Sequence, residues 1–367
     1  MRHMKPVPDR RPKSTIIVIV VACVCVIAIG ALLFSTLMRP AGGGSSNQPA
    51  ATTQGKVDTT SQGNSSGKGS ATATTQPNAS TTPAPAPTPE PASQPAPEPA
   101  AAPATVDTSQ LSSVCAEIAA NSGMDTCIAV TDLTNGASAE YNGGSSVVSA
   151  SMIKLIVAEA FLEQVQAGAY DLDASYVLQS QDIVGGTGTL SGLGAGASVT
   201  YREILERMIS VSDNTGANIL INAVGMDAVN AAAQRLGLTG TQLNRLMMDT
   251  DAIAAGIENY VSANDVARLL SMVYNGTFVD QSSSSLMLHA LELQEDGEGI
   301  AQGLPGDVVF AHKTGTLSNA RHDGGIVECS HPYVIVVLCS GDGFSAGGAT
   351  QTMINAASTI HSSIVGA

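Results

Sequence analysis

Three short motifs with reactive side chains follow one another in the last two-thirds of this 367-residue chain. They are Ser151-Met152-Ile153-Lys154, Ser212-Asp213-Asn214 and Lys313-Thr314-Gly315. Together they offer a hydroxyl nucleophile, an amine that can accept its proton, a second hydroxyl that can relay a proton, and a cation that can bind an anionic group. These are the parts needed to open an amide through a covalent acyl-serine.

The first motif opens a run of apolar residues, 149–167, which predicts a buried helix that ends at Gly168. Residues three apart on a helix share a face, so we expect the Lys154 amine beside the Ser151 hydroxyl. Partial burial would lower the pKa of Lys154 and let it act as the base. The alternative is a capping serine and a surface lysine. The motif is weak alone, because Ser65-Ser66-Gly67-Lys68 also matches it.

The second motif opens a predicted helix at 214–224. In the functional interpretation, the Ser212 hydroxyl lies near the leaving nitrogen, and Asn214 holds Lys154 and a substrate amide. In the alternative interpretation, the motif is only a helix cap with an acid in the first turn.

The third motif lies on a strand-like stretch, and here Lys313 and Thr314 would bind a substrate carboxylate. Gly315 would leave room for substrate along the strand, and the N–H groups of Ser151 and Thr316 would form an oxyanion hole. The alternative is an edge strand protected by a lysine.

The charges of residues 108–367 support an anion-binding site. This part holds 26 of the 31 Asp and Glu but only 8 of the 16 Lys and Arg, so nucleic acid is not an expected partner. Yet Lys154, Lys313 and Arg321 lie in or beside the motifs. Arg321 could supplement Lys313, or it could be a solvated turn arginine. We expect His322 and Asp323 to be structural hydrogen-bonding residues.

The predicted elements that must position these residues have helices in the middle and strands at both ends. Strands are expected at 126–132 and 137–141 around Asn135-Gly136, and again at 308–316, 325–329 and 333–339. Helices are expected at 109–121, 201–211, 227–236, 262–274 and 349–365, besides those already named. The fold class is therefore α+β: one antiparallel sheet built from both ends of the domain, flanked by the terminal helices, with an inserted all-helical subdomain. The site would lie in the groove between them.

The first 107 residues have a different composition. Residues 1–14 form a basic tail, and 15–38 form an apolar run long enough to cross a bilayer. Residues 39–107 form an Ala-, Pro-, Ser- and Thr-rich linker with too little apolar bulk to fold. The charge bias predicts a signal-anchor in the cell membrane with the domain at 108–367 outside the cell. A cleaved signal peptide or a lipoprotein signal is the alternative.

The domain carries four cysteines: Cys115, Cys127, Cys329 and Cys339. An even number in an oxidising compartment allows two disulfides with three pairings, and buried free thiols are the alternative. No Cys/His spacing resembles a zinc site, so no cofactor is expected. We expect a monomer.

The order of the three motifs resembles that of class A β-lactamases and penicillin-binding proteins, for which this triple is a known signature. The stretch from Ser212 to Leu220 is similar to the second motif of that family beyond its core. The resemblance covers residues 110–365 and implies this fold and an acyl-serine mechanism.

One departure concerns the loop glutamate that activates the deacylating water in class A β-lactamases. One alignment places Gly240 at that position, and another, which matches Thr241–Arg245 to the start of the loop, places Met247 there. Neither provides a glutamate. Asp249, Asp251 and Glu258 are the nearby acids. We therefore expect acylation through Lys154 to survive, whereas the sequence leaves open which group, if any, supports fast deacylation.

Three functions follow from these observations. The leading one is a membrane-anchored serine hydrolase that opens β-lactams or related amides. The second is a D-alanyl-D-alanine peptidase or transpeptidase acting on peptidoglycan stem peptides. The third is a penicillin-binding sensor that acylates and stops.

Overall fold

The computed structural model describes residues 106–366. The predicted tail at 1–14, the transmembrane helix at 15–38 and the linker up to residue 105 lie outside the described residues. Among the residues that are described, no helix has both the length and the apolar character needed to span a bilayer.

The centre of the fold is a five-stranded antiparallel sheet with the order β2-β1-β9-β8-β7. Its strands come from both ends of the domain, as predicted: β1 (Asp125–Asp132), β2 (Ser138–Tyr141), β7 (Val309–Leu317), β8 (Ala320–Glu328) and β9 (Tyr333–Ser340). The edge strand β7 carries the third motif, so one side of this motif is left unpaired for the site.

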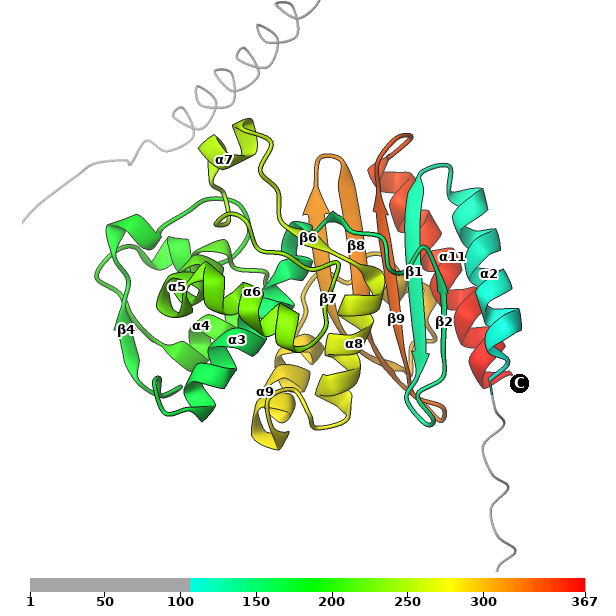
Figure 1. Cartoon of the computed structure of the whole chain (residues 1–367), viewed down its shortest axis with the longest axis horizontal. Helices are drawn as coiled ribbons and strands as arrows, with labels where there is room; N and C mark the ends of the chain where they lie inside the picture. Colours follow the sequence, from blue (N-terminus) through cyan, green and yellow to red (C-terminus); the bar gives the residue numbers. More distant parts are fainter. Residues whose placement is uncertain (1–105, 367) are drawn as a thin grey trace, which may run out of the picture. The chain divides into compact units, whose positions relative to one another are not determined.

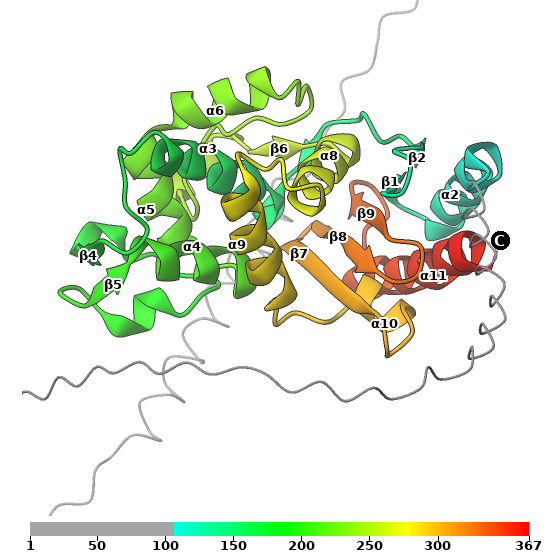
Figure 2. The same cartoon turned by 90° about the horizontal axis from the view of Figure 1, so that it is seen from below.

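Helices cover both faces of the sheet (Figures 1 and 2). The terminal helices α2 (Thr108–Ser122) and α11 (Ala346–Val365) pack on one face, and α8 (Ala263–Tyr274) packs on the other. The central strand β9 accordingly buries side chains on both sides: Val334 and Val336 contact one core and Ile335 and Val337 the other. A strand with two covered faces is apolar at successive positions, as β9 is.

The inserted subdomain lies beside the sheet, on the far side of it from α2 and α11 (Figure 1). It is mainly helical rather than all-helical as predicted, because residues 175–177 and 198–200 form a two-stranded antiparallel sheet in it. It contains α3 (Lys154–Gln166), α4 (Tyr201–Ser210), α5 (Asn214–Val224) and α6 (Met226–Arg235). Every residue of α3 from Lys154 to Leu162 is buried. The predicted α+β fold with an inserted helical subdomain is confirmed.

The prediction for β8 was wrong in extent, because this strand begins at Ala320 rather than at residue 325. Its first half contains the polar residues Arg321 and His322, followed by Asp323 and two glycines, and Asp and Gly are depleted in strands. Hydrogen bonding to β7 on one side and β9 on the other overrides that propensity.

Several elements were not predicted. The largest is α9 (Gln281–Glu292), which contacts β7 and α8. The others are short: β3 (Val147–Val148), β4 (Ser175–Val177), β5 (Ser198–Thr200), α7 (Thr250–Ala254), β6 (Tyr260–Val261), α10 (Ile300–Gly303) and the 3₁₀ turns η1 (Ala150–Ile153), η2 (Ser180–Asp182) and η3 (Leu190–Leu193).

The four cysteines within residues 106–366 are free thiols, so the structure agrees with the predicted alternative of free thiols and not with two disulfides. The sheet separates Cys127 from the core that contains Cys115 and Cys339. Burial raises the pKa of Cys115 and Cys339 to about 12, which keeps both thiols protonated.

Candidate active site

All three motifs contribute to one cleft of about 440 Å³ at the junction of the helical subdomain and the sheet. Ser151 lies on η1, Ser212 and Asn214 lie at the start of α5, and Thr314 and Thr316 lie on β7. These five residues, far apart in the sequence, line the same cavity.

The Lys154 side chain is buried and lies at the meeting point of the first two motifs. Its Nζ is 3.2 Å from Ser151 Oγ, 3.1 Å from Ser212 Oγ, 2.6 Å from the Ser212 carbonyl oxygen and 2.8 Å from Asn214 Oδ1. The Ser212 carbonyl oxygen and Asn214 Oδ1 can only accept hydrogen bonds, so each binds one N–H of the Lys154 amine. A neutral amine then has its lone pair left for a serine hydroxyl.

The surroundings of Lys154 favour that neutral amine. Burial is the main cause that holds the pKa of Lys154 well below its ordinary value, and the positive charge of Lys313 adds to it. The carboxylate of Asp213 acts in the opposite direction. The alternative of a surface lysine is wrong.

In the second motif, Asp213 caps a helix and Ser212 contacts Lys154. Asp213 is the N-cap of α5: its Oδ1 accepts from Gly216 N–H at 2.9 Å, and its Oδ2 accepts from Leu190 N–H at 2.7 Å. Ser212 has φ +55°, in the left-handed region that costs a non-glycine residue energy. In this conformation its hydroxyl lies 3.1 Å from Lys154 Nζ.

The third motif places a buried cation behind the cleft. Burial lowers the pKa of Lys313 to about 7, although Asp323 acts to raise it. Lys313 Nζ donates to the Thr314 carbonyl at 2.8 Å, while Thr314 and Thr316 face the cavity. A Cβ on Gly315 would lie 3.1 Å from Ser151 N, so this strand needs a glycine to approach the nucleophile.

Arg321 does not line the cleft. Its guanidinium donates to Glu298 at 2.8 Å and lies 3.6 Å from Asp296. It is a strand residue with a largely buried side chain rather than a solvated turn arginine.

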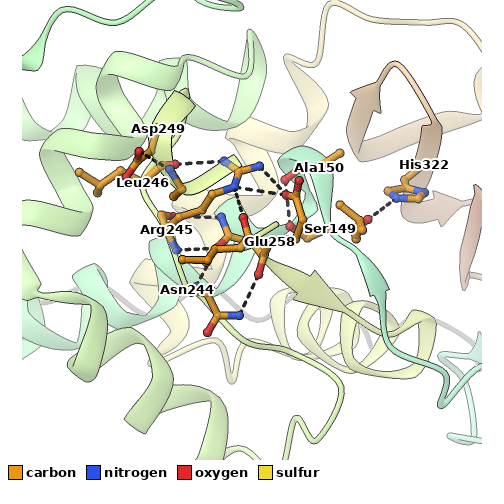
Figure 3. A network of polar contacts seen from close by, with 12 residues as sticks. Ser149, Ala150, Asn244, Arg245, Leu246, Asp249, Glu258 and His322 are labelled. Atoms are coloured by element: carbon orange, nitrogen blue, oxygen red, sulfur yellow. Dashed lines mark hydrogen bonds and ion pairs between the residues drawn. The ribbon is translucent and has the colours of Figure 1, made fainter. Parts of the chain in front are cut away.

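A loop from Gln242 to Tyr260 closes another side of the cleft, and Arg245 organises it (Figure 3). The Arg245 guanidinium donates to Glu258 at 2.6 Å and to the carbonyls of Leu246 and Ile257. The Asn259 side chain binds the backbone of Arg245 on both its N–H and its carbonyl. The network holds the loop against the residues that precede Ser151.

Met247 of this loop lines the cleft with its neighbour Met248, whereas Gly240 does not. The structure therefore supports the alignment that places Met247 at the position of the missing glutamate. Asp249 caps α7, Glu258 is paired with Arg245, and neither reaches the cavity.

Sequence reasoning missed several cleft residues. The acids that do line the cavity are Glu295 and Asp296, which follow α9. Thr187 also lines it and donates to the Ser212 carbonyl at 2.7 Å. None of these residues stands in a recognisable motif, and only the packing of the subdomain on the sheet brings them to Ser151.

An antiparallel sheet with an inserted helical subdomain, and a Ser-Lys-Ser cluster at their junction, define the class of penicillin-recognising serine hydrolases. Residues 109–364 match the profile of the Beta-lactamase enzyme family, and the chain belongs to that family.

Among similar proteins is the extended-spectrum beta-lactamase PER-1 of Pseudomonas aeruginosa, 27% identical over 190 residues, or 48% of this chain and 61% of that protein. Beta-lactamase AER-1 of Aeromonas hydrophila is 26% identical over 51% of this chain and 62% of its own length. The chain thus spans about three fifths of the length of these curated relatives.

Solved structures share the fold. The beta-lactamase of Sphaerobacter thermophilus has a TM-score of 0.62 and 26% identity, covering 69% of this chain and 97% of that one. PBP-A has a TM-score of 0.65 and 22% identity, covering 72% and 99%. A variant of PBP-A was solved as an acyl-enzyme complex with penicillin G.

Proposed function

We propose that the protein opens β-lactams or related amides through an acyl-Ser151 intermediate. The observation that carries this proposal is the position of Lys154 Nζ, within 3.2 Å of both serine hydroxyls in a buried site that favours the neutral amine. Membership of the Beta-lactamase enzyme family and the PBP-A acyl-enzyme support it.

The acylation step uses this geometry directly. Lys154 accepts the proton of Ser151 as Ser151 Oγ forms a bond to the substrate carbonyl carbon. The N–H groups of Ser151 and Thr316 stabilise the oxyanion. The C–N bond then breaks, and the leaving nitrogen takes a proton through the Ser212 hydroxyl, which Lys154 replenishes. Asn214 orients the amine. Thr314 lines the place for a substrate carboxylate, with Lys313 buried behind it and Gly315 leaving room along the strand.

Breakdown of the ester is the slow half of the reaction in this proposal. A water must be deprotonated near the acyl carbon, and the loop wall at the position of the missing glutamate offers Met247 and Met248, which cannot accept a proton. The acids that line the cleft, Glu295 and Asp296, follow α9 and do not belong to this loop. The same observation favours the two other candidate functions, a penicillin-binding sensor that acylates and stops, and a D-alanyl-D-alanine peptidase or transpeptidase that penicillin acylates for a long time.

The full-length protein, incubated with a chromogenic cephalosporin and a fluorescent penicillin, separates these functions. A Ser151 adduct in the intact mass spectrum that turns over slowly supports the proposal, and Ser151→Ala should form none. Release of D-alanine from a stem peptide would favour the peptidase. A lack of any adduct would exclude all three functions.

We also propose that residues 15–38 anchor the protein in the cell membrane and that the catalytic domain lies outside, as a monomer. The apolar run and the basic residues before it support this placement. Protease treatment of intact cells should remove the domain, and recovery of uncleaved protein in the soluble fraction would contradict the anchor.

A further inference from the structure

We infer that His322 is a positioning residue, which holds the backbone just before Ser151 in the geometry that acylation needs. We call residues 148–151 the nucleophile turn. The inference rests on the proposed acylation of Ser151 and adds a residue that does not touch the substrate.

The nucleophile turn is strained next to the reactive serine. Ala150 has φ +45°, in the left-handed region that residues with a Cβ avoid. Such a conformation persists only when neighbouring groups hold it, and it occurs most often at functional sites. The contacts of this turn therefore decide where Ser151 Oγ and the Ser151 N–H point.

Two hydrogen bonds hold the turn from opposite sides. The Ser149 N–H donates to the Asn259 carbonyl at 2.8 Å, from the loop that Arg245 organises. His322 Nε2 lies 2.8 Å from the Val148 carbonyl oxygen. In Figure 3, Ser149 and Ala150 lie between Arg245 and His322.

His322 acts from the strand beside the third motif. It pairs directly with Gly315 in the register of β7 and β8, and a Cβ on Gly315 would lie 3.1 Å from Ser151 N. The sheet thus meets the nucleophile turn at two adjacent points, through the bare backbone of Gly315 and the imidazole of His322.

The chemistry of the ring fits this single task. A carbonyl can only accept, so Nε2 carries the hydrogen. Nδ1 is buried and has no hydrogen-bond partner among residues 106–366. Burial lowers the pKa of His322 to about 4, so the ring is neutral near pH 7. The hydrogen bond from Nε2 to the Val148 carbonyl is therefore the polar contact that the buried His322 ring makes here.

Three variants of the full-length protein test the inference. His322→Gln keeps an N–H donor near the Nε2 position, and His322→Met fills the space without a donor. The matched control is His331→Met. His331 is buried like His322, and its Nε2 lies 2.9 Å from Asp132, but it lies in the turn after the other end of β8.

The readout is the acylation rate constant with a fluorescent penicillin, at a temperature well below the lowest Tm of the set. We expect His322→Met to lower it roughly 10- to 100-fold with little change in the binding constant, because small displacements of a reacting group cost about that much. His322→Gln should stay close to wild type. His331→Met should lower Tm and leave acylation unchanged.

Equal acylation by His322→Met and wild type would overturn the inference, and so would equal losses in the Met and Gln variants. If His322→Met does not fold, His322→Asn takes its place, because its shorter side chain leaves the donor away from Val148. Failure of the wild type to form a Ser151 adduct would instead refute the proposed function, and the inference with it.

Discussion

Asn218 holds the backbone of Met247 at both of its polar groups. Its Nδ2 donates to the Met247 carbonyl at 3.0 Å, and its Oδ1 accepts from the Met247 N–H at 2.7 Å. Asn218 belongs to α5, the helix that begins with Asn214 of the second motif. The same helix therefore positions Asn214, which binds Lys154, and the loop residue Met247, which lines the same cleft.

A first prediction is that Met247→Glu speeds deacylation. The new carboxylate would lie on the cleft wall, on a backbone that Asn218 holds. A positioned general base raises a rate by about 10²- to 10⁴-fold. We expect a gain toward the lower end, because burial raises the pKa of a carboxyl and reduces the share of its basic form. The decay rate of the Ser151 adduct, followed by mass spectrometry, measures it.

The matched control is Ile257→Glu, which adds the same charge to the same loop at an exposed residue outside the cleft. Adduct decay in this control should equal that of wild type. An unchanged decay rate in a folded Met247→Glu variant would show that this wall does not reach the deacylating water.

Replacement of Lys154 should abolish acylation rather than binding. Lys154→Met removes the base, and Lys154→Arg replaces it with a group that stays charged. Both should lower the acylation rate constant by about 10²- to 10⁴-fold. Stopped-flow fluorescence gives the constant, and Arg268→Met, which removes an exposed cation on α8, serves as the control. Acylation at the wild-type rate in either Lys154 variant would assign the base to another group.

The lowered pKa of Lys313 predicts weaker carboxylate binding at alkaline pH. Its charge is present below about pH 7 and is lost as pH rises through that value. The binding constant of a penicillin should therefore weaken above pH 7, whereas its methyl ester, which lacks the carboxylate, should show no such change. If the binding constants of the acid and the ester depend on pH in the same way, Lys313 does not bind the substrate carboxylate.

The same lysine links stability to pH. Its ordinary pKa is about 10.4, so between about pH 7 and 10 the unfolded chain binds a proton that the folded protein does not. The contribution of Lys313 to the free energy of unfolding should accordingly rise with pH across this window. Urea denaturation at several pH values measures the slope, and Lys313→Met should reduce it. If the free energy of unfolding of Lys313→Met depends on pH as in the wild type, burial does not lower the pKa of Lys313.

Arg321 is predicted to matter less than its place beside the third motif suggests. Glu298 and Asp296 already occupy its guanidinium, and a pair with such exposed carboxylates contributes about 0–1 kcal/mol. Arg321→Ala should therefore change stability and penicillin binding only slightly. Glu298→Gln should also leave penicillin binding nearly unchanged, because Asp296 still pairs with the guanidinium and Arg321 does not line the cleft. A large loss of penicillin affinity in Arg321→Ala would restore its predicted role in carboxylate binding.

Much of the fold could be predicted because its signals are local. The apolar run of α3, the Asn135-Gly136 turn between β1 and β2, and the apolar strand β9 each follow from residues within a few positions of one another. The first half of β8 could not be predicted, because Asp323 and the two glycines after it have low strand propensity and pairing with β7 and β9 makes this segment a strand.

The sequence by itself determined which reactive groups the protein has, their order along the chain and the class of fold that carries them. Tertiary structure decided which of them meet. Lys154 reaches Ser212 and Asn214 across 58 and 60 residues, Arg321 is tied to Glu298, and Met247 faces the cleft. The physical reason is that such contacts, and the burial that lowers the pKa of both lysines, arise only when the helical subdomain packs on the sheet and excludes water.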